Sequence, residues 1–424
     1  MNALLESLGI QLQGDALLAL RLVAALAAIY ALSIAGQVGF IRAMQRTPVG
    51  SALSAGGWVA LAVGAAVGPR GMGLLNAEVV DMAKPIMVVL LAWIGLIIGL
   101  QARRAILQRI PAVLWKWSLS DAAVSLALAI AAAAGLRLYW FDPHQASAAW
   151  TTLTALALFG ALVGWSPETR SLGAGLGAAK SRTATLVHAG GGMAAIAAAF
   201  LSAPAIALLV RNADGSLALA PQSFVTALFI SCAFGLFLAV GARVLLRQAG
   251  GDEATTWLIL LATVALAGGV AATTGFSPIT AGAICGLTMA NLRGELRPIE
   301  RVIAQSEPAV STALFVLAGT LVRTPDSSWA WGVALALVGA RALLKPACMA
   351  ACLSDQQQHL DLRGPLLAAP MRQSALAVAI GVTLCIEEGG QFLGELLGLV
   401  VIAGAGSSLL AMGVVVLARP RLAT

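Results

Sequence analysis

The sequence predicts an all-α polytopic membrane protein with about thirteen transmembrane helices. Composition is the first observation: 59% of the 424 residues are hydrophobic and only 11% are charged, whereas a soluble chain of this length needs more charge to cover its surface. Apolar runs of about 20 residues, the length that spans a bilayer as a helix, recur from end to end. Only helices and closed barrels satisfy their backbone polar groups in lipid, and the sequence lacks the period-2 alternation of a barrel.

The apolar runs give the order of the expected helices, and the basic residues test their number. Arg and Lys are enriched in cytoplasmic connections, and with the N-terminus outside they gather strongly in the inside connections. This favours an outside N-terminus, a cytoplasmic C-terminus and an odd number of spans, although merging two neighbouring pairs would also keep the alternation. We expect spans over residues 17–41, 49–68, 83–102, 113–136, 147–167, 183–210, 222–246, 255–272, 275–292, 307–323, 328–352, 364–385 and 394–417.

Charge, cysteine usage and motifs exclude several classes of protein. The positive-inside bias explains the net charge of +7 without a nucleic-acid partner. Residues 1–16 lack the basic start of a cleavable signal peptide, so we expect none. Cys348 and Cys352 lie one helical turn apart with no His nearby, and we interpret all five cysteines as packing residues. No nucleotide-binding loop or nucleophile–base pair is visible, so we expect no enzyme, no cofactor and no metal site.

Five segments, in this order, resemble the cation/proton antiporter superfamily. They read TPVGSALSAGGWVALAVGAAVGP (47–69), PIMVVLLAWIGLIIGLQARR (85–104), GFSPITAGAICGLTMAN (275–291), GARALLKPA (339–347) and APMRQSALAVAI (369–380). The resemblance implies thirteen helices in two inverted repeats of six, with a core in which two discontinuous helices cross near the midplane. It divides the single transmembrane domain, 1–424, into first-repeat scaffold helices (17–136), first-repeat core helices (147–210), linker and second-repeat scaffold helices (222–323), and second-repeat core and final helices (328–417).

Both discontinuous helices have a counterpart in the sequence. GALVGWSPETRSLGAG (160–175) contains Pro167, which lacks an amide donor and disfavours a continuous helix. Pro370 interrupts the apolar run 364–385, where Arg372 and Gln373 are expected to serve the crossing region. The alternatives are a helix that simply ends at Pro167 and a helix that begins with proline in its first turn.

The sequence departs from the superfamily at its central ligand. Exchange in the superfamily depends on an aspartate in helix 6, whose carboxylate binds either a proton or a cation. In SRTATLVHAGGGMAAIAAAF (181–200), the place of the usual Asn-Asp pair is taken by Gly192 and Met193. His188, one turn earlier, either titrates near neutral pH or is a packed, hydrogen-bonded histidine.

Other carboxylates could replace the missing aspartate. Asp121 lies about two turns into the helix expected over 113–136, where it is either a proton or cation site or a satisfied structural group. Glu168 follows Ser166 and Pro167, which match the crossing motif of the superfamily. It lies either in the unwound region or at the cytoplasmic mouth.

Two basic residues at membrane depth, Arg341 and Lys345, share a helical face because they are four positions apart. A charge at this depth costs at least about 2.5 kcal/mol and is usually paired or functional. In the superfamily a cation of this helix pairs with the helix-6 carboxylate or stabilises the crossing half-helices. Here Asp121 or Glu168 is the expected partner, unless the cations face an anionic substrate or snorkel to the cytoplasmic surface.

The resemblance implies a secondary transporter that exchanges a monovalent cation, sodium or potassium, for protons by alternating access. The missing aspartate leaves two alternatives open: a transporter of an anion or small organic solute on the same scaffold, or a transport-inactive scaffold or sensor subunit of a membrane complex. The expected partners are monovalent cations, protons and the lipid bilayer, with a homodimer as the assembly and additional membrane subunits under the last alternative. The expected location is a bacterial inner membrane.

Overall fold

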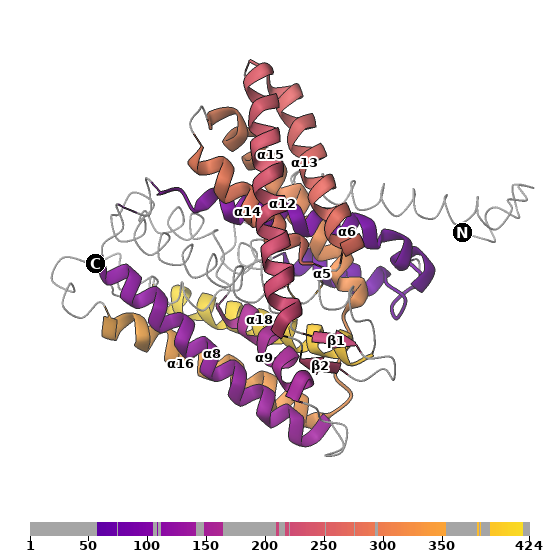
Figure 1. Ribbon diagram of the computed structural model, residues 1–424. Helices are drawn as coiled ribbons and strands as arrows, with labels where there is room; N and C mark the ends of the chain where they lie inside the picture. The colour runs from indigo at the N-terminus through magenta and orange to yellow at the C-terminus, as the bar shows by residue number, and fades with distance from the viewer. Residues whose placement is uncertain are drawn as a thin grey trace, which may run out of the picture.

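The computed structural model describes residues 57–73, 75–104, 108, 112–140, 148–163, 209–211, 217–219, 221–250, 252–274, 276–292, 296–352, 380, 382 and 391–418. Almost all of them are helical (Figure 1). In chain order the helices and strands are α5 (Trp58–Val67), α6 (Ala77–Gln101), α8 (Ala112–Trp140), α9 (Ala148–Val163), β1 (Leu209–Arg211), β2 (Leu217–Leu219), α12 (Pro221–Gln248), α13 (Glu253–Thr274), α14 (Pro278–Asn291), α15 (Arg297–Leu321), α16 (Ser328–Cys352) and α18 (Gln391–Ala418).

The predicted fold class, an α-helical multi-pass membrane protein, is confirmed. Six of the described helices are long and apolar enough to cross a membrane: α6, α8, α12, α13, α15 and α16. Large apolar side chains point outward along them, such as Phe229 and Phe237 of α12, which are 73% and 70% exposed. An exposed apolar face of this kind suits lipid. The predicted number of thirteen is not tested, because the helices expected over 17–41, 183–210 and 364–385 lie wholly or largely outside the described residues.

Two elements differ from the sequence-based expectation. Residues 209–211 form a strand that pairs antiparallel with 217–219, although the helix expected over 183–210 includes the start of this hairpin. Helix α15 begins at Arg297, about ten residues before the expected start. The earlier start has a sequence basis, because Pro298 is favourable in a first turn and Ile299, Val302 and Ile303 form a buried helical stripe.

Helices α6 and α14 pack together through glycines on both sides. Gly95 and Gly99 of α6, like Gly282 and Gly286 of α14, are four positions apart on one face. A Cβ added to any of the four would collide with a backbone carbonyl of the other helix. Paired small residues of this kind let two helix backbones approach closely, which is a common way of packing helices in lipid.

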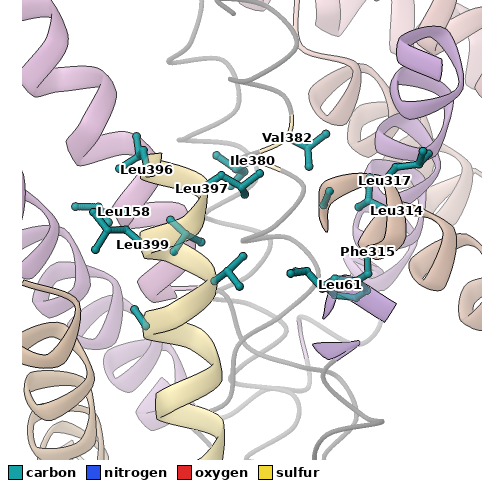
Figure 2. Packing of buried hydrophobic residues seen from close by; sticks show 14 of the residues in the cluster. Leu61, Leu158, Leu314, Phe315, Leu317, Ile380, Val382, Leu396, Leu397 and Leu399 are labelled. Atoms are coloured by element: carbon teal, nitrogen blue, oxygen red, sulfur yellow. The ribbon is translucent and has the colours of Figure 1, made fainter. Parts of the chain in front are cut away.

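The extensive packing among the described helices falls into two groups. The first group comprises α5, α6, α12, α13, α14 and α15, and the second comprises α8, α9, α16 and α18. Apolar side chains fill the space between them: in Figure 2, Leu314 of α15 lies on one side, Leu396 of α18 on the other, and Ile380 in between. The connection from α15 to α16 also joins the groups, because the Arg323 N–H donates to the Gly394 carbonyl of α18 at 2.9 Å.

Helix α8 packs against α9 and α16. The expected domain division assigns residues 17–136, which include most of α8, to the first-repeat scaffold. The division of the whole chain stays a prediction, since much of the expected core lies outside the described residues. The position of α8 matters for function because this helix carries Asp121.

Candidate functional site

A buried ion pair connects α8 and α16, which lie side by side (Figure 1). The Nζ atom of Lys345 donates a hydrogen bond to Oδ2 of Asp121 at 2.9 Å. The two side chains are 1% and 7% exposed. Asp121 lies about 13 Å from the start of α8, given the 1.5 Å rise per residue. The pair therefore sits at membrane depth rather than at a helix end.

The spacing of buried residues along α8 and α16 explains why the Asp121 and Lys345 side chains face each other. One face of α8 is buried over residues at spacings of three and four: Ser118, Asp121, Ser125, Ala129 and Ala133. The facing stripe of α16 has the same spacing: Ala334, Leu337, Arg341, Lys345 and Met349. Small residues on α8 let the two helices approach closely, so the carboxylate on one stripe meets the ammonium on the other.

The sequence leaves the partner of Lys345 open among Asp121, Glu168, an anionic substrate and the membrane surface. Its partner is Asp121, and its near-complete burial excludes snorkelling to the surface. Arg341 is 2% exposed and lies within electrostatic range of the same carboxylate. Charges this deep require partners, because an uncompensated buried charge costs several kcal/mol. The cluster thus combines one carboxylate with two cations.

Two oxygen atoms beside the ion pair remain available for a ligand. Asp121 uses Oδ2 for Lys345, while its Oδ1 accepts no hydrogen bond from the described residues. Ser125 lies one turn further along the same face; its side chain is buried, and its Oγ has no hydrogen-bond partner among the described residues. Serine and threonine in helices commonly bond back to a carbonyl one turn earlier, as Thr263 and Ser407 do here.

Ser125 is a candidate that the sequence analysis missed. Its signal is its position four residues after Asp121, which places a hydroxyl next to a carboxylate on one helical face. The described residues hold no group of three or more His, Cys, Asp and Glu side chains that could bind a metal ion. Oxygen ligands such as these suit a hard cation rather than a transition metal.

The other predicted site residues lie outside the described residues. They belong to the two expected crossing regions and to the helix expected over 183–210. Their roles stay predictions, and they are Ser166, Pro167, Glu168, His188, Gly192, Met193, Pro370, Arg372 and Gln373.

Comparison with known proteins bears on the family and the fold. The sequence profile of the family described as "Sodium/hydrogen exchanger, transmembrane" matches residues 56–417. Among solved structures, the sodium proton antiporter MjNhaP1 from Methanocaldococcus jannaschii, at pH 8, is similar in fold with a TM-score of 0.58 at 15% sequence identity. The alignment covers 96% of this chain and 97% of that one. No curated protein sequence matches the chain.

Proposed function

Because the chain belongs to the transmembrane sodium/hydrogen exchanger family, we propose that it exchanges a monovalent cation, sodium or potassium, for protons across a membrane. The observation that carries the proposal is the ion pair of Asp121 and Lys345, buried between two helices of an exchanger fold. The family is one of transporters rather than enzymes. The proposal is that Asp121 performs the exchange chemistry in place of the helix-6 aspartate that the sequence lacks.

The chemistry of the ion pair suits competition between a cation and a proton. A carboxylate at this depth needs a positive partner, because leaving it charged and alone costs several kcal/mol. Lys345 supplies that partner in the structure. When Lys345 moves away or loses its proton, the carboxylate takes up either a metal cation or a proton. Only one of these ligands is held at a time, and this exclusivity couples the two fluxes.

The available oxygens indicate where the cation would bind. Monovalent and other hard cations prefer oxygen ligands. Oδ1 of Asp121 and Oγ of Ser125 lie on the same face of α8 and accept no hydrogen bond from the described residues. We therefore propose that these two oxygens contribute to the cation site. The remaining ligands would come from water or from other parts of the chain.

The division of the described helices into two groups suggests how alternating access could occur. Asp121, Ser125 and Lys345 all lie in the second group, which packs extensively within itself. We propose that this group moves as a unit against the first group and exposes the site to one side at a time. With the outside N-terminus inferred from the basic residues, α8 begins and α16 ends on the cytoplasmic side. Access to the pair from the cytoplasm would then cross about 10–14 Å.

The two alternative functions have less support from the structure. An anion or organic solute transporter would use Arg341 and Lys345 as free cations, but Lys345 is bonded to a carboxylate. No observation on the described residues favours a transport-inactive scaffold or sensor subunit. A homodimer in a bacterial inner membrane, with its N-terminus outside and its C-terminus cytoplasmic, remains our expectation for the assembly and location.

Transport in proteoliposomes tests the proposed function. Vesicles with an acidic interior should lose their pH gradient when sodium or potassium is added outside, as reported by an internal pH-sensitive dye. Asp121→Asn should abolish this response. The matched control is Asp81→Asn, which neutralises an aspartate that is also paired with a lysine at 2.9 Å but is 67% exposed, and it should exchange normally.

The outcomes are distinguishable even when one variant folds poorly. Asp121→Glu keeps the carboxylate and should retain part of the exchange. Absence of any cation-dependent proton flux in the wild-type chain would refute exchange. Normal flux in Asp121→Asn would place the chemistry elsewhere in the chain.

A further inference from the structure

Two cysteines on α16, Cys348 and Cys352, take no part in the proposed exchange chemistry. They are four residues apart, so they share a face with their Cβ atoms about 5–6 Å apart. Both thiols are free, and both residues are only partly buried. The pair therefore places two thiols on one face of α16, close to its C-terminal end.

The dithiol adjoins the buried ion pair. Cys348 follows Lys345 by three residues on α16, so the two side chains lie next to each other on the same side of the helix. The thiolate is the form of cysteine that binds metals. A ligand held by the two sulfurs would change the charge directly beside Lys345.

A site made of two cysteine thiols is suited to one particular class of metal ion. Thiolates are soft ligands that select Cu(I), Zn and iron–sulfur clusters, and d¹⁰ monovalent ions such as Cu(I) accept two sulfurs in a linear arrangement. A structural zinc ion needs four protein ligands, and the described residues offer no group of three or more His, Cys, Asp and Glu side chains. Two thiols one helical turn apart therefore suit a soft monovalent ion better than zinc.

We propose that Cys348 and Cys352 bind a soft monovalent metal ion of the Cu⁺ or Ag⁺ class, and that the bound ion blocks exchange at Asp121 and Lys345. On binding, two S–H bonds break, two metal–sulfur bonds form and two protons leave to the solvent. No electron is transferred. The product, a metal bis-thiolate, carries one net negative charge. This charge competes with Asp121 for the ammonium of Lys345 and so disturbs the pair. The blocking step rests on the proposed function, whereas the binding step does not.

Silver binding to the purified full-length chain tests the site. In chloride-free buffer, with glutathione as a monothiol competitor, the wild-type chain should retain one Ag⁺ and release about two protons on binding it. Cys348→Ser or Cys352→Ser should each weaken binding about 100-fold, because a second linked ligand typically raises avidity by roughly that factor. Serine is close in size to cysteine, so each variant should elute from a sizing column like the wild type.

The matched control is Cys232→Ser, which removes an exposed thiol on α12. It should leave the retained Ag⁺ unchanged. Equal affinity in the wild-type chain and the Cys348→Ser/Cys352→Ser double variant would overturn the site, as would loss of binding in Cys232→Ser.

Exchange assays test the blocking step separately. Ag⁺ should stop cation-dependent proton flux in wild-type proteoliposomes, and a dithiol chelator should restore it. The double serine variant should exchange with or without Ag⁺. Continued flux in the wild type at saturating Ag⁺ would overturn the blocking step. Absence of flux in every sample would refute the proposed function and with it the blocking step, while the silver titration would still decide whether the dithiol site exists.

Discussion

Nζ of Lys345 and Oδ2 of Asp121 lie 2.9 Å apart, although 224 positions separate the two residues in the sequence. Neither charge is tolerable at this depth without the other, since an unpaired buried ion costs several kcal/mol. The packing of α8 on α16 and the charge state of the pair therefore depend on each other. Any event that neutralises one partner must change the contact between the two helices.

Removing the lysine alone should destabilise the protein strongly. Lys345→Met leaves the Asp121 carboxylate buried without its ammonium, so the free energy of unfolding should fall by about 3–5 kcal/mol. The double variant Asp121→Asn/Lys345→Met should recover most of this loss, because it removes both members of the ion pair together. Unfolding in mild detergent, followed by circular dichroism, measures the three values and the coupling between the sites.

The exposed pair of Asp81 and Lys84 on α6 is the control for this cycle. Its atoms are also 2.9 Å apart, but the side chains are 67% and 40% exposed. Exposed pairs contribute only about 0–1 kcal/mol, so Lys84→Met should change stability little. Equal effects of Lys345→Met and Lys84→Met would contradict the importance of burial.

Hydropathy and charge were sufficient to predict the fold class, and the motifs were sufficient to predict the family. Apolar runs are long enough in a membrane protein to stand out without any knowledge of tertiary contacts. Helix α15 shows the limit of this approach, because its first ten residues are polar on one face and only the spacing of Ile299, Val302 and Ile303 indicates a helix.

The candidate site could be predicted only in part. Charged residues at membrane depth are rare, so Asp121, Arg341 and Lys345 stand out in the sequence. The choice of Asp121 rather than Glu168 as the partner of Lys345 depends on which helices pack together, and the sequence does not contain that information locally. Ser125 was missed because a serine in an apolar helix usually bonds to its own backbone.

The glycines between α6 and α14 should be intolerant of a single methyl group. Gly95→Ala would drive a Cβ into the carbonyl of Ile279, and backbone atoms cannot move aside cheaply. We expect a loss of about 1–3 kcal/mol in stability, the usual cost of overpacking. The control is Gly269→Ala on α13, whose added Cβ meets no atom within 4 Å. A loss of stability in Gly269→Ala as large as in Gly95→Ala would contradict the close approach of the two helices.

Asp252 should make the start of α13 sensitive to acid. The N–H and hydroxyl of Thr255 both donate to its Oδ2, at 2.7 and 2.5 Å, and these bonds lower the pKa of the carboxyl from its ordinary value. Because the pKa is lower in the folded state, the stabilisation is present above the ordinary carboxyl pKa. It is lost as the pH falls through the folded pKa.

Hydrogen exchange of the first-turn amides of α13 measures this effect. Protection should fall at acidic pH in the wild type and be low at every pH in Asp252→Ala. Asp252→Asn still caps the helix but does not titrate, so its protection should not change with pH over this range. A wild-type profile that matches Asp252→Asn would show that the carboxylate charge is unimportant.

Ser125 should affect cation affinity without affecting folding. Its hydroxyl makes no hydrogen bond to the described residues, so Ser125→Ala removes no internal bond and should leave stability nearly unchanged. If the hydroxyl binds the cation together with Oδ1 of Asp121, its loss should raise the half-saturating cation concentration about tenfold, the effect of losing one hydrogen-bond-sized contact of about 1.4 kcal/mol. The maximal rate should change much less, because the carboxylate that exchanges the proton is retained. Half-saturation is measured from proton flux at increasing sodium or potassium concentration.

Ser311→Ala on α15 is the control, since that hydroxyl donates a hydrogen bond to the Glu307 carbonyl at 2.6 Å and should not affect cation affinity. An unchanged half-saturating concentration in Ser125→Ala would remove this serine from the cation site and leave Asp121 as the ligand contributed by α8.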